Sequence, residues 1–215
     1  MIVASDLNGT LTTGSPILAV AKWAEINQAS LPPKLFKIRI LLSYLQVRFG
    51  LKELDVWADK NLRGVLDLIS SPTPEKLTEI MTFIVEDELW PKRRPEAIEL
   101  LKKFHQQGAE IILVSAAFEP AVEIFGEKIV PGDISGIGTP IFIEDGKLSL
   151  ANELTVREKK MDRVRSKLGS RNLDYALGDT IADLPMLKAS HNPIAVAPDH
   201  QLRVHALERG WKILD

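Results

Sequence analysis

Three short apolar segments of this 215-residue chain each lead into a polar residue, and this pattern limits the possible fold most. The segments and the residues that follow them are Ile2–Ala4 before Asp6, Ile111–Val114 before Ser115, and Tyr175–Leu177 before Gly178-Asp179. Short apolar runs without alternation are typical of parallel strands, which are covered on both faces. Ligands of parallel sheets bind at the carboxyl ends of the strands, so these polar positions are candidates for a functional site.

Helical patterns separate the apolar runs. The helix that opens at Arg94-Pro95 has proline in its first turn and ends near Gly108. Further predicted helices are Asp162–Leu168, Ile181–Leu187 and His200–Leu207, and further predicted strands are Pro193–Ala197 and Trp211–Leu214. Alternation of strands and helices predicts an α/β fold with a doubly wound, mostly parallel sheet.

One long stretch, Gly14 to Trp90, does not alternate and is helical in pattern. Its predicted breaks are Leu31-Pro32-Pro33, Phe49-Gly50 and Ser70–Pro74. A stretch of about 75 residues is too long for a simple crossover, which usually needs a dozen or more. We therefore predict an inserted α-helical cap at 14–90 and an α/β core made of 1–13 and 91–215.

A second insertion is predicted at Gly136–Leu150. The turn Glu144-Asp145-Gly146 stands there between two apolar runs. Such a turn between apolar runs indicates a β-hairpin.

The first chemical motif is the segment Asp6 to Thr12 directly after a predicted strand. A carboxylate at position 6 can attack phosphorus and form an aspartyl-phosphate, which divides hydrolysis into two easier steps. Gly9 allows a tight turn in which backbone amides face phosphoryl oxygens. The same letters, Asp-Leu-Asn-Gly, are also the pattern of a plain turn that ends a strand.

The second motif is Gly178 to Asp183. Asp179 and Asp183, four residues apart across a strand-to-helix turn, can face one hard cation, and Mg²⁺ favours a few carboxylates together with water and substrate phosphate. The alternative is helix capping, because acidic residues are favoured at a helix N-terminus.

Two weaker signals complete the set. The hydroxyl of Ser115 can hold a phosphoryl oxygen, although a serine after a strand is common. Lys159 and Lys160 open a helix, where an ammonium can neutralise a nucleophile and a phosphoryl group. Two lysines on a helix are otherwise typical of a solvated face.

In this order the four motifs resemble the haloacid dehalogenase superfamily. Its pattern is strand–Asp-x-Asp-Gly-Thr, strand–Ser or Thr, Lys, and Gly-Asp-x-x-x-Asp. The resemblance favours Lys160 over Lys159, because Lys160 stands four residues before the apolar Val164, as the lysine of relatives stands before an apolar residue. The resemblance implies a Rossmann-like core and a Mg²⁺-dependent phosphomonoester hydrolase. It also implies a set of roles: Asp6, Asn8, Ser115 and Lys160 in catalysis, Gly9, Thr10, Ser115 and Lys160 against the substrate, and Asp6, Asn8, Asp179 and Asp183 at the metal.

The last part of the chain resembles the phosphoserine-phosphatase-like branch of that superfamily. The segments concerned are Leu184–Leu187, Ala195–Asp199 and Arg209–Trp211. That branch carries a helical cap between its first two motifs, where this chain has its longer insertion. True dehalogenases also use an aspartate nucleophile but need no Mg²⁺, so the pair Asp179 and Asp183 disfavours that activity.

Asn8 departs from the family pattern, which has a second aspartate here. In family phosphatases that acid protonates the leaving group and then activates water. An amide does neither at neutral pH, whereas its backbone carbonyl can still bind Mg²⁺. Two explanations stay open: a natural member that is slow or does not hydrolyse, or a deliberate Asp-to-Asn substitution that traps a complex. The alternative to an impaired phosphatase is a phosphate-ligand binding protein that keeps the fold.

The predicted partner is a small phosphorylated substrate. Relatives that take phosphoserine hold its amino group with a glutamate soon after the first motif. Here the window Thr13 to Ile17 contains no acid and the next one is Glu25, so phosphoserine is disfavoured. Between Glu25 and Glu53 there are only basic charges, interleaved with apolar residues: Lys34, Lys37, Arg39, Arg48 and Lys52. This segment is either a cap helix packed by its apolar face or a basic amphipathic helix that meets a lipid-like substrate or a membrane.

Composition limits the other classes of partner and the location. The net charge of −2 provides no field that would attract nucleic acid. The absence of cysteine excludes thiolate chemistry. The N-terminus does not resemble a secretory signal, and no apolar run approaches the roughly 20 residues of a spanning helix, so a cytoplasmic protein is predicted.

Overall fold

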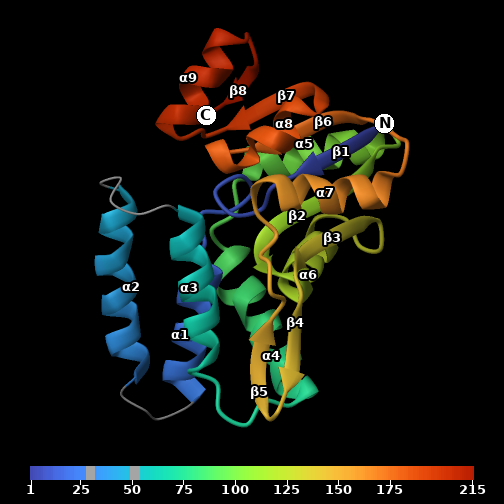
Figure 1. Cartoon of the computed structure of the whole chain (residues 1–215). Coiled ribbons are helices and arrows are strands. Elements are labelled where there is room, and N and C mark those ends of the chain that lie inside the picture. Colours follow the sequence, from blue (N-terminus) through green and yellow to red (C-terminus); the bar gives the residue numbers. More distant parts are fainter. Residues whose placement is uncertain (28–31, 49–53) are drawn as a thin grey trace.

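The computed structural model describes residues 1–27, 32–48 and 54–215, and its centre is a six-stranded sheet (Figure 1). The strands are β1 Ile2–Ser5, β2 Glu110–Phe118, β3 Ile134–Thr139, β6 Leu173–Gly178, β7 Ser190–Val196 and β8 Lys212–Leu214. They pair in parallel in the order β3-β2-β1-β6-β7-β8. Because the sheet grows outwards from β1 in both directions, the predicted doubly wound α/β fold is confirmed.

Helices cover both faces of the sheet. Helices α5 (Pro95–Gln106) and α6 (Glu119–Ile129) pack on one face with Val3 and Leu113. Helices α7 (Arg157–Leu168), α8 (Leu184–Lys188) and α9 (His200–Glu208) pack on the other with Ala4 and Ile112. Neighbouring strand residues thus enter opposite apolar clusters, which explains why these strands are apolar throughout instead of alternating.

The segment between β1 and β2 is helical, as predicted. Its elements are α1 Pro16–Asn27, α2 Pro32–Arg48, α3 Leu54–Leu66, α4 Pro74–Phe83 and the π-helix η1 Ile84–Leu89. The predicted break at Ser70–Pro74 is confirmed: Thr73 caps α4 by accepting a hydrogen bond from the amide of Lys76 (3.2 Å). The predicted breaks at Leu31 and at Phe49-Gly50 lie outside the described residues, and Pro32 opens α2.

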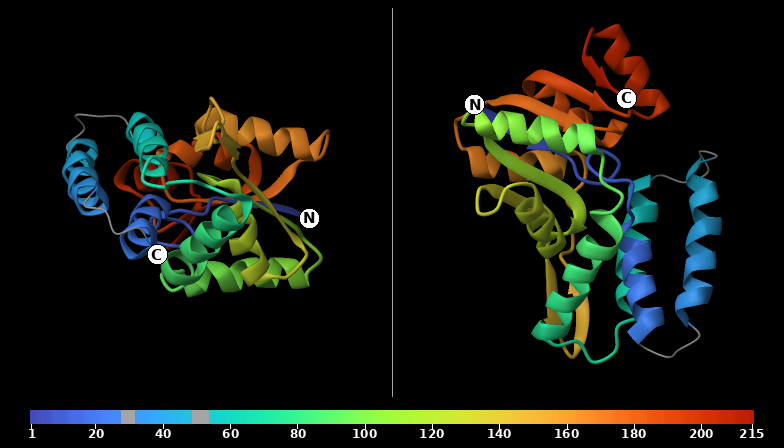
Figure 2. Two further views of the ribbon diagram at one scale, coloured as in Figure 1. Left: turned by 90° about the horizontal axis from the view of Figure 1, so that it is seen from below. Right: turned by 180° about the vertical axis from the view of Figure 1, so that it is seen from behind.

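The inserted helices and the hairpin described below extend from the sheet toward the same side (Figures 1 and 2). One apolar cluster runs without interruption through Leu11, Trp23, Leu89 and Phe125, and thus joins the insertion to the core helix α6. The division into a core and a 14–90 cap therefore stays a prediction. None of the helices in the described ranges is long and apolar enough to cross a membrane.

The predicted hairpin is confirmed as β4 (Ile141–Glu144) and β5 (Lys147–Leu150), paired antiparallel. Its predicted start at Gly136 is wrong, because Gly136 belongs to the parallel strand β3 and pairs with Leu113. A Cβ on Gly136 would lie 2.7 Å from the Glu123 side chain, and one on Gly138 would lie 2.3 Å from the Cα of Glu119. The close approach of α6 requires glycines in this strand, and the glycines conceal the strand pattern.

Candidate active site

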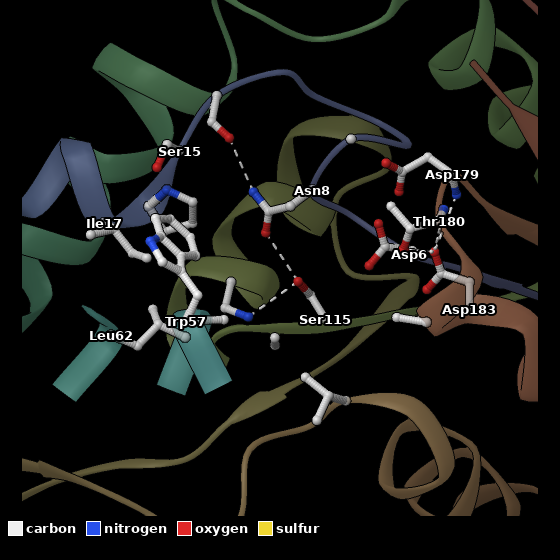
Figure 3. Close-up of a pocket in the computed structure, with 18 of the residues that line it drawn as sticks. Asp6, Asn8, Ser15, Ile17, Trp57, Leu62, Ser115, Asp179, Thr180 and Asp183 are labelled. Atoms are coloured by element: carbon white, nitrogen blue, oxygen red, sulfur yellow. Dashed lines mark hydrogen bonds between the residues drawn. The ribbon is translucent and has the colours of Figure 1, made fainter. Parts of the chain in front are cut away.

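The candidate site lies where the strand order reverses. Asp6 follows β1 and Asp179 follows β6, and these neighbouring strands begin the two halves of the sheet. Crevices at the carboxyl ends of the strands on either side of such a point are the usual ligand sites of open α/β sheets. Figure 3 shows Asp6, Asp179 and Asp183 close together there.

Asp6 is 4% exposed and is held by two side chains. The Lys160 ammonium donates to Oδ1 of Asp6 (2.7 Å), and the Thr10 hydroxyl donates to Oδ2 (3.0 Å). Burial raises the pKa of Asp6 to about 6; the Lys160 charge opposes this shift and the Asp183 charge adds to it. Asp6 is thus a fixed carboxylate with a cation beside it, as an attacking group requires.

Asp6, Asp179 and Asp183 form an acidic cluster. One carboxylate oxygen from each lies within 4.8 Å of the others. Burial raises the pKa of Asp179 well above its ordinary range, and the charges of Asp6 and Asp183 add to the shift. A hard divalent cation between these oxygens would relieve that repulsion, so the donor set fits Mg²⁺.

Asp183 differs from the other two acids because backbone amides of its own loop donate to its carboxylate. Oδ1 accepts from the Lys160 ammonium (2.6 Å), and Oδ2 accepts from the backbone amides of Asp179 and Thr180 (3.2 Å each). These bonds complete a capping box with Thr180 at the turn that follows β6. Asp183 therefore acts as the cap that the sequence left open as an alternative, and it fixes the loop that presents Asp179.

Lys160 lies on the first turn of α7 and is 5% exposed. Its ammonium joins Asp6 and Asp183 across the site, and Lys159 instead pairs with the exposed Glu153. Burial lowers the pKa of Lys160, but the two carboxylates more than offset this effect and raise it above its ordinary value. Lys160 is thus a permanent cation beside the candidate nucleophile, not a proton donor.

Gly9 allows the two acidic loops to meet. Its φ is +95°, in the region that favours glycine, and a Cβ built on it would lie 1.9 Å from Oδ2 of Asp179. The loop is also fixed from outside, since the Arg94 side chain donates to the Gly9 carbonyl (2.8 Å). Thr10 is fully buried, and its hydroxyl lies 3.0 Å from a carboxylate oxygen of Asp6 and 3.0 Å from one of Asp179, so it shares its single proton between them. Thr10 thus aligns the acids from beneath.

Asn8 stands between the acidic cluster and the open part of the cavity (Figure 3). Its amide nitrogen donates to the Gly14 carbonyl (3.2 Å), and its Oδ1 accepts from the Ser115 hydroxyl (3.1 Å). Ser115 in turn accepts from the amide of Ala117 (3.2 Å). It was expected just after a strand, but it lies inside the longer β2, where the pairing with β3 is irregular between Val114 and Phe118.

A cavity of about 500 Å³ opens from the acidic cluster toward the inserted helices. Its floor is formed by the loop residues just described, and its far wall is apolar. That wall is formed mainly by Ile17 of α1, Ile40 and Leu41 of α2, and Trp57 and Leu62 of α3. The Trp57 indole N–H donates to Ser43 (2.9 Å), so the polar edge of this ring already has a partner.

All the site residues expected from the sequence lie around this cavity or directly beneath it. Asp6, Asn8, Gly9, Ser115, Lys160, Asp179 and Asp183 line the cavity, and Thr10 joins two of them. Their roles in a reaction stay predictions. The apolar wall was not expected: Ile40 and Leu41 belong to an apolar stretch of the sequence, whereas Trp57 and Leu62 carried no signal.

Comparison with known proteins places this architecture among hydrolases. The family model described as haloacid dehalogenase-like hydrolase matches residues 3–188. A Streptomyces azureus protein named for inhibition of morphological differentiation is 31% identical over 147 residues, which cover 66% of this chain and 52% of that protein. The chain thus spans about half of the length of this relative.

Two solved structures share the fold over nearly the whole chain. A Bordetella pertussis Tohama I protein of unknown function has a TM-score of 0.79 at 22% identity and covers 100% of this chain and 97% of its own. A substrate-bound phosphoserine phosphatase has a TM-score of 0.63 at 19% identity, with 99% and 91% covered. At these identities the likeness concerns the fold.

Proposed function

Because this chain belongs to the haloacid dehalogenase-like hydrolase family, we propose that it is a Mg²⁺-dependent phosphomonoester hydrolase with Asp6 as its nucleophile. The resemblance to the phosphoserine-phosphatase-like branch is confirmed at the level of fold. One observation carries the proposal. A buried carboxylate, Asp6, lies 2.7 Å from a buried ammonium, and two further carboxylates face it at the mouth of a cavity.

The first chemical step would transfer the phosphoryl group to the protein. An Asp6 carboxylate oxygen forms a bond to phosphorus while the bond from phosphorus to the ester oxygen breaks. The leaving group departs as an alkoxide that takes a proton from water, and an aspartyl-phosphate remains. Lys160 keeps its charge and offsets the negative charge that gathers on the phosphoryl oxygens. Water then attacks phosphorus, releases inorganic phosphate and restores the carboxylate.

Mg²⁺, when bound, would neutralise phosphoryl charge and orient the group for in-line attack. The side chains of Asp6 and Asp179 and the backbone carbonyl of Asn8 would hold the ion, together with Asp183 either directly or through a water molecule. In a calorimetric titration with Mg²⁺, Asp179→Ala should lose most of the binding heat. Unchanged binding would remove Asp179 from the metal site.

The helices at 14–90 would act as the cap of this enzyme. The cavity has the acidic loops on one side and α1, α2 and α3 on the other, so a bound substrate would lie between them. Closing that space limits the access of water to the phosphoryl group during transfer.

Asn8 would impair both steps of the reaction. A departing alkoxide needs a proton and the second step needs a base for water, and an amide supplies neither at neutral pH. The position nevertheless suits an acid: a carboxyl group there would face the Gly14 carbonyl oxygen, which only accepts, and this favours the protonated form. The bonded Asn8 amide equally favours a second candidate function, a protein that binds a phosphate ligand without hydrolysing it.

The test is the turnover of Asn8→Asp beside the parent protein, with Mg²⁺ and a broad set of phosphomonoesters. General acid–base catalysis is typically worth about 10² to 10⁴-fold, so turnover of alkyl phosphates should rise by roughly two orders of magnitude or more. KM should shift far less, because Lys160, Ser115 and the metal residues are unchanged.

An aryl phosphate serves as the internal control. Its leaving group needs less help from an acid, so Asn8 should slow its first step less than that of an alkyl phosphate. If Asn8→Asp gives no gain on any ester while Mg²⁺ still binds, the hydrolase proposal fails and the binding function takes its place.

A further inference from the structure

The wall of the cavity that faces the candidate nucleophile is apolar, and it indicates a class of substrate that the motifs do not reveal. Apart from Asp6, Asp179 and Asp183, no carboxylate lines the cavity in the described part of the chain. Arg157 lines it from the start of α7, on the core side. The side that would meet the leaving group is formed mainly by Ile17, Leu62 and the ring of Trp57, and Figure 3 shows Ser15 beside them.

A polar leaving group would bind weakly against such a wall. The ammonium and carboxylate of an amino acid, or the several hydroxyls of a sugar, would lose water against these apolar side chains. Apart from the hydroxyls of Thr13 and Ser15, the described residues on this side offer such groups no side-chain partner, and buried polar groups without partners are costly. An alkyl group has the opposite balance, since each methylene that becomes buried tightens binding by up to about fourfold.

The size of the cavity sets a limit on the leaving group. With about 30 Å³ for each heavy-atom group, the volume a water molecule takes in the liquid, a cavity of about 500 Å³ holds a phosphoryl group and roughly ten carbon atoms. The cavity opens to solvent beside α2, since Leu41 of this helix lines the cavity and is also 66% exposed.

The outer face of α2 continues the apolar wall. Ile38 and Leu45, three residues before and four residues after Leu41, are its neighbours on the helix and are exposed as well. Among the residues of this helix whose side chains are described, Phe36 and Ile40 are buried. Packing of α2 against its neighbours thus explains why these two residues are apolar, but it does not explain the exposed Ile38, Leu41 and Leu45. An alkyl chain too long for the cavity would contact these exposed side chains.

We propose that the substrate is a phosphomonoester with an apolar, lipid-like leaving group that occupies the chamber between Ile17, Leu41, Trp57 and Leu62. This inference rests on the proposed function, because it assigns the leaving-group side of the same site. It selects the lipid-like alternative for the basic, apolar α2 segment, of which Lys52 lies outside the described residues.

Alkyl phosphonates test the inference without any need for turnover, because their carbon–phosphorus bond is not an ester. Ethyl, butyl, hexyl and octyl phosphonate are titrated calorimetrically into the Mg²⁺-loaded protein, below the concentrations at which they form micelles. The Kd should fall with each added pair of carbons, and octyl phosphonate should bind roughly 50-fold or more tightly than ethyl phosphonate. A Kd that does not change with chain length would overturn the inference.

Two variants on the same helix provide a matched pair. Leu41 and Leu35 are 66% and 67% exposed, so a polar substitution at either position should not prevent folding. Of the two, only Leu41 lines the cavity. Leu41→Gln should weaken octyl phosphonate binding by roughly threefold or more and leave ethyl phosphonate unchanged. Leu35→Gln should change neither, and equal effects of the two variants would contradict the chamber.

The two proposals fail in different ways. If ethyl phosphonate binds with Mg²⁺ but octyl phosphonate binds no more tightly, the phosphoryl site stands and the apolar substrate class is wrong. If no phosphonate binds with Mg²⁺, the proposed hydrolase site itself is wrong, and the substrate class is wrong with it.

Discussion

At the scale of single residues, the site depends on a close approach between two loops that only glycine allows. Gly9 combines a φ of +95° with the nearness of Asp179, whose Oδ2 would lie 1.9 Å from an added Cβ. Gly108 provides a comparison, since its φ is +80° but an added Cβ would meet nothing within 4 Å. A substitution at Gly108 would cause backbone strain alone, whereas a substitution at Gly9 would cause both strain and a clash with Asp179.

Gly9→Ala should therefore abolish Mg²⁺ binding, because the added methyl group displaces Asp179 from Asp6. Gly108→Ala should cost only the strain of a positive φ, about 1 kcal/mol, and should leave Mg²⁺ binding intact. Calorimetric titration with Mg²⁺ and thermal unfolding of both variants check this. Normal Mg²⁺ affinity in Gly9→Ala would show that the loops can separate without harm.

At the scale of elements, Arg63 joins the inserted helices to the hairpin. From α3 its guanidinium donates to the carbonyls of Ala151 (2.9 Å) and Asn152 (3.0 Å), just beyond β5, and Asp59 accepts from its Nε (2.8 Å). One guanidinium thus donates hydrogen bonds to two backbone carbonyls of the segment after β5, which is distant from α3 in sequence. The side chain of Arg63 is 36% exposed, so solvent weakens these bonds.

Arg63→Ala should lower the stability by about 1–2 kcal/mol, or several degrees in Tm for a chain of this size, because the carbonyls lose a charged donor. Lys102→Ala is the matched control, since it removes an exposed ion pair within one helix and should change the Tm little. Thermal unfolding followed by circular dichroism measures both. If Arg63→Ala melts at the same temperature as Lys102→Ala, the contact does not connect the two elements.

At the scale of the whole molecule, the acidic cluster links stability to pH and to metal. In metal-free protein the folded-state pKa of Asp6 is about 6, above the ordinary 3.8, and that of Asp179 is raised as well. An acid with a raised pKa holds its proton in the folded state after the unfolded chain has lost it. Its contribution to stability is therefore most favourable below about pH 4 and is lost as pH rises through about 6.

Asp179→Asn should consequently stabilise the metal-free protein by several degrees at pH 7.5, and the gain should shrink at pH 5. The difference between variant and parent at each pH cancels the titration of groups outside the cluster. Mg²⁺ should raise the Tm of the parent protein but not that of Asp179→Asn. A variant that melts below the metal-free parent at pH 7.5 would refute the repulsion on which this prediction depends.

The sequence alone determined the α/β class, the helical insertion and the four motifs, because strand periodicity, helix punctuation and strand-end acids are local properties of the chain. The sequence did not reveal the edge strand β3, because its glycines are required by the close approach of α6 and do not have the apolar pattern of a strand. It also left open whether Asp183 binds a metal or caps a helix. The tertiary structure decided that Asp183 caps the loop after β6 while it also pairs with Lys160.

Only the tertiary structure could bring Ile17, Leu41, Trp57 and Leu62 opposite the acids, because these residues come from three helices whose packing no local pattern encodes. The same holds for the Asn8 amide, which lies between the Gly14 carbonyl and the Ser115 hydroxyl of β2. Hydrophobic packing has no preferred direction, so an apolar pattern predicts that a side chain packs against other apolar groups but not which groups it will meet. The motifs thus indicate the chemistry, and the folded chain selects the surface that the leaving group meets.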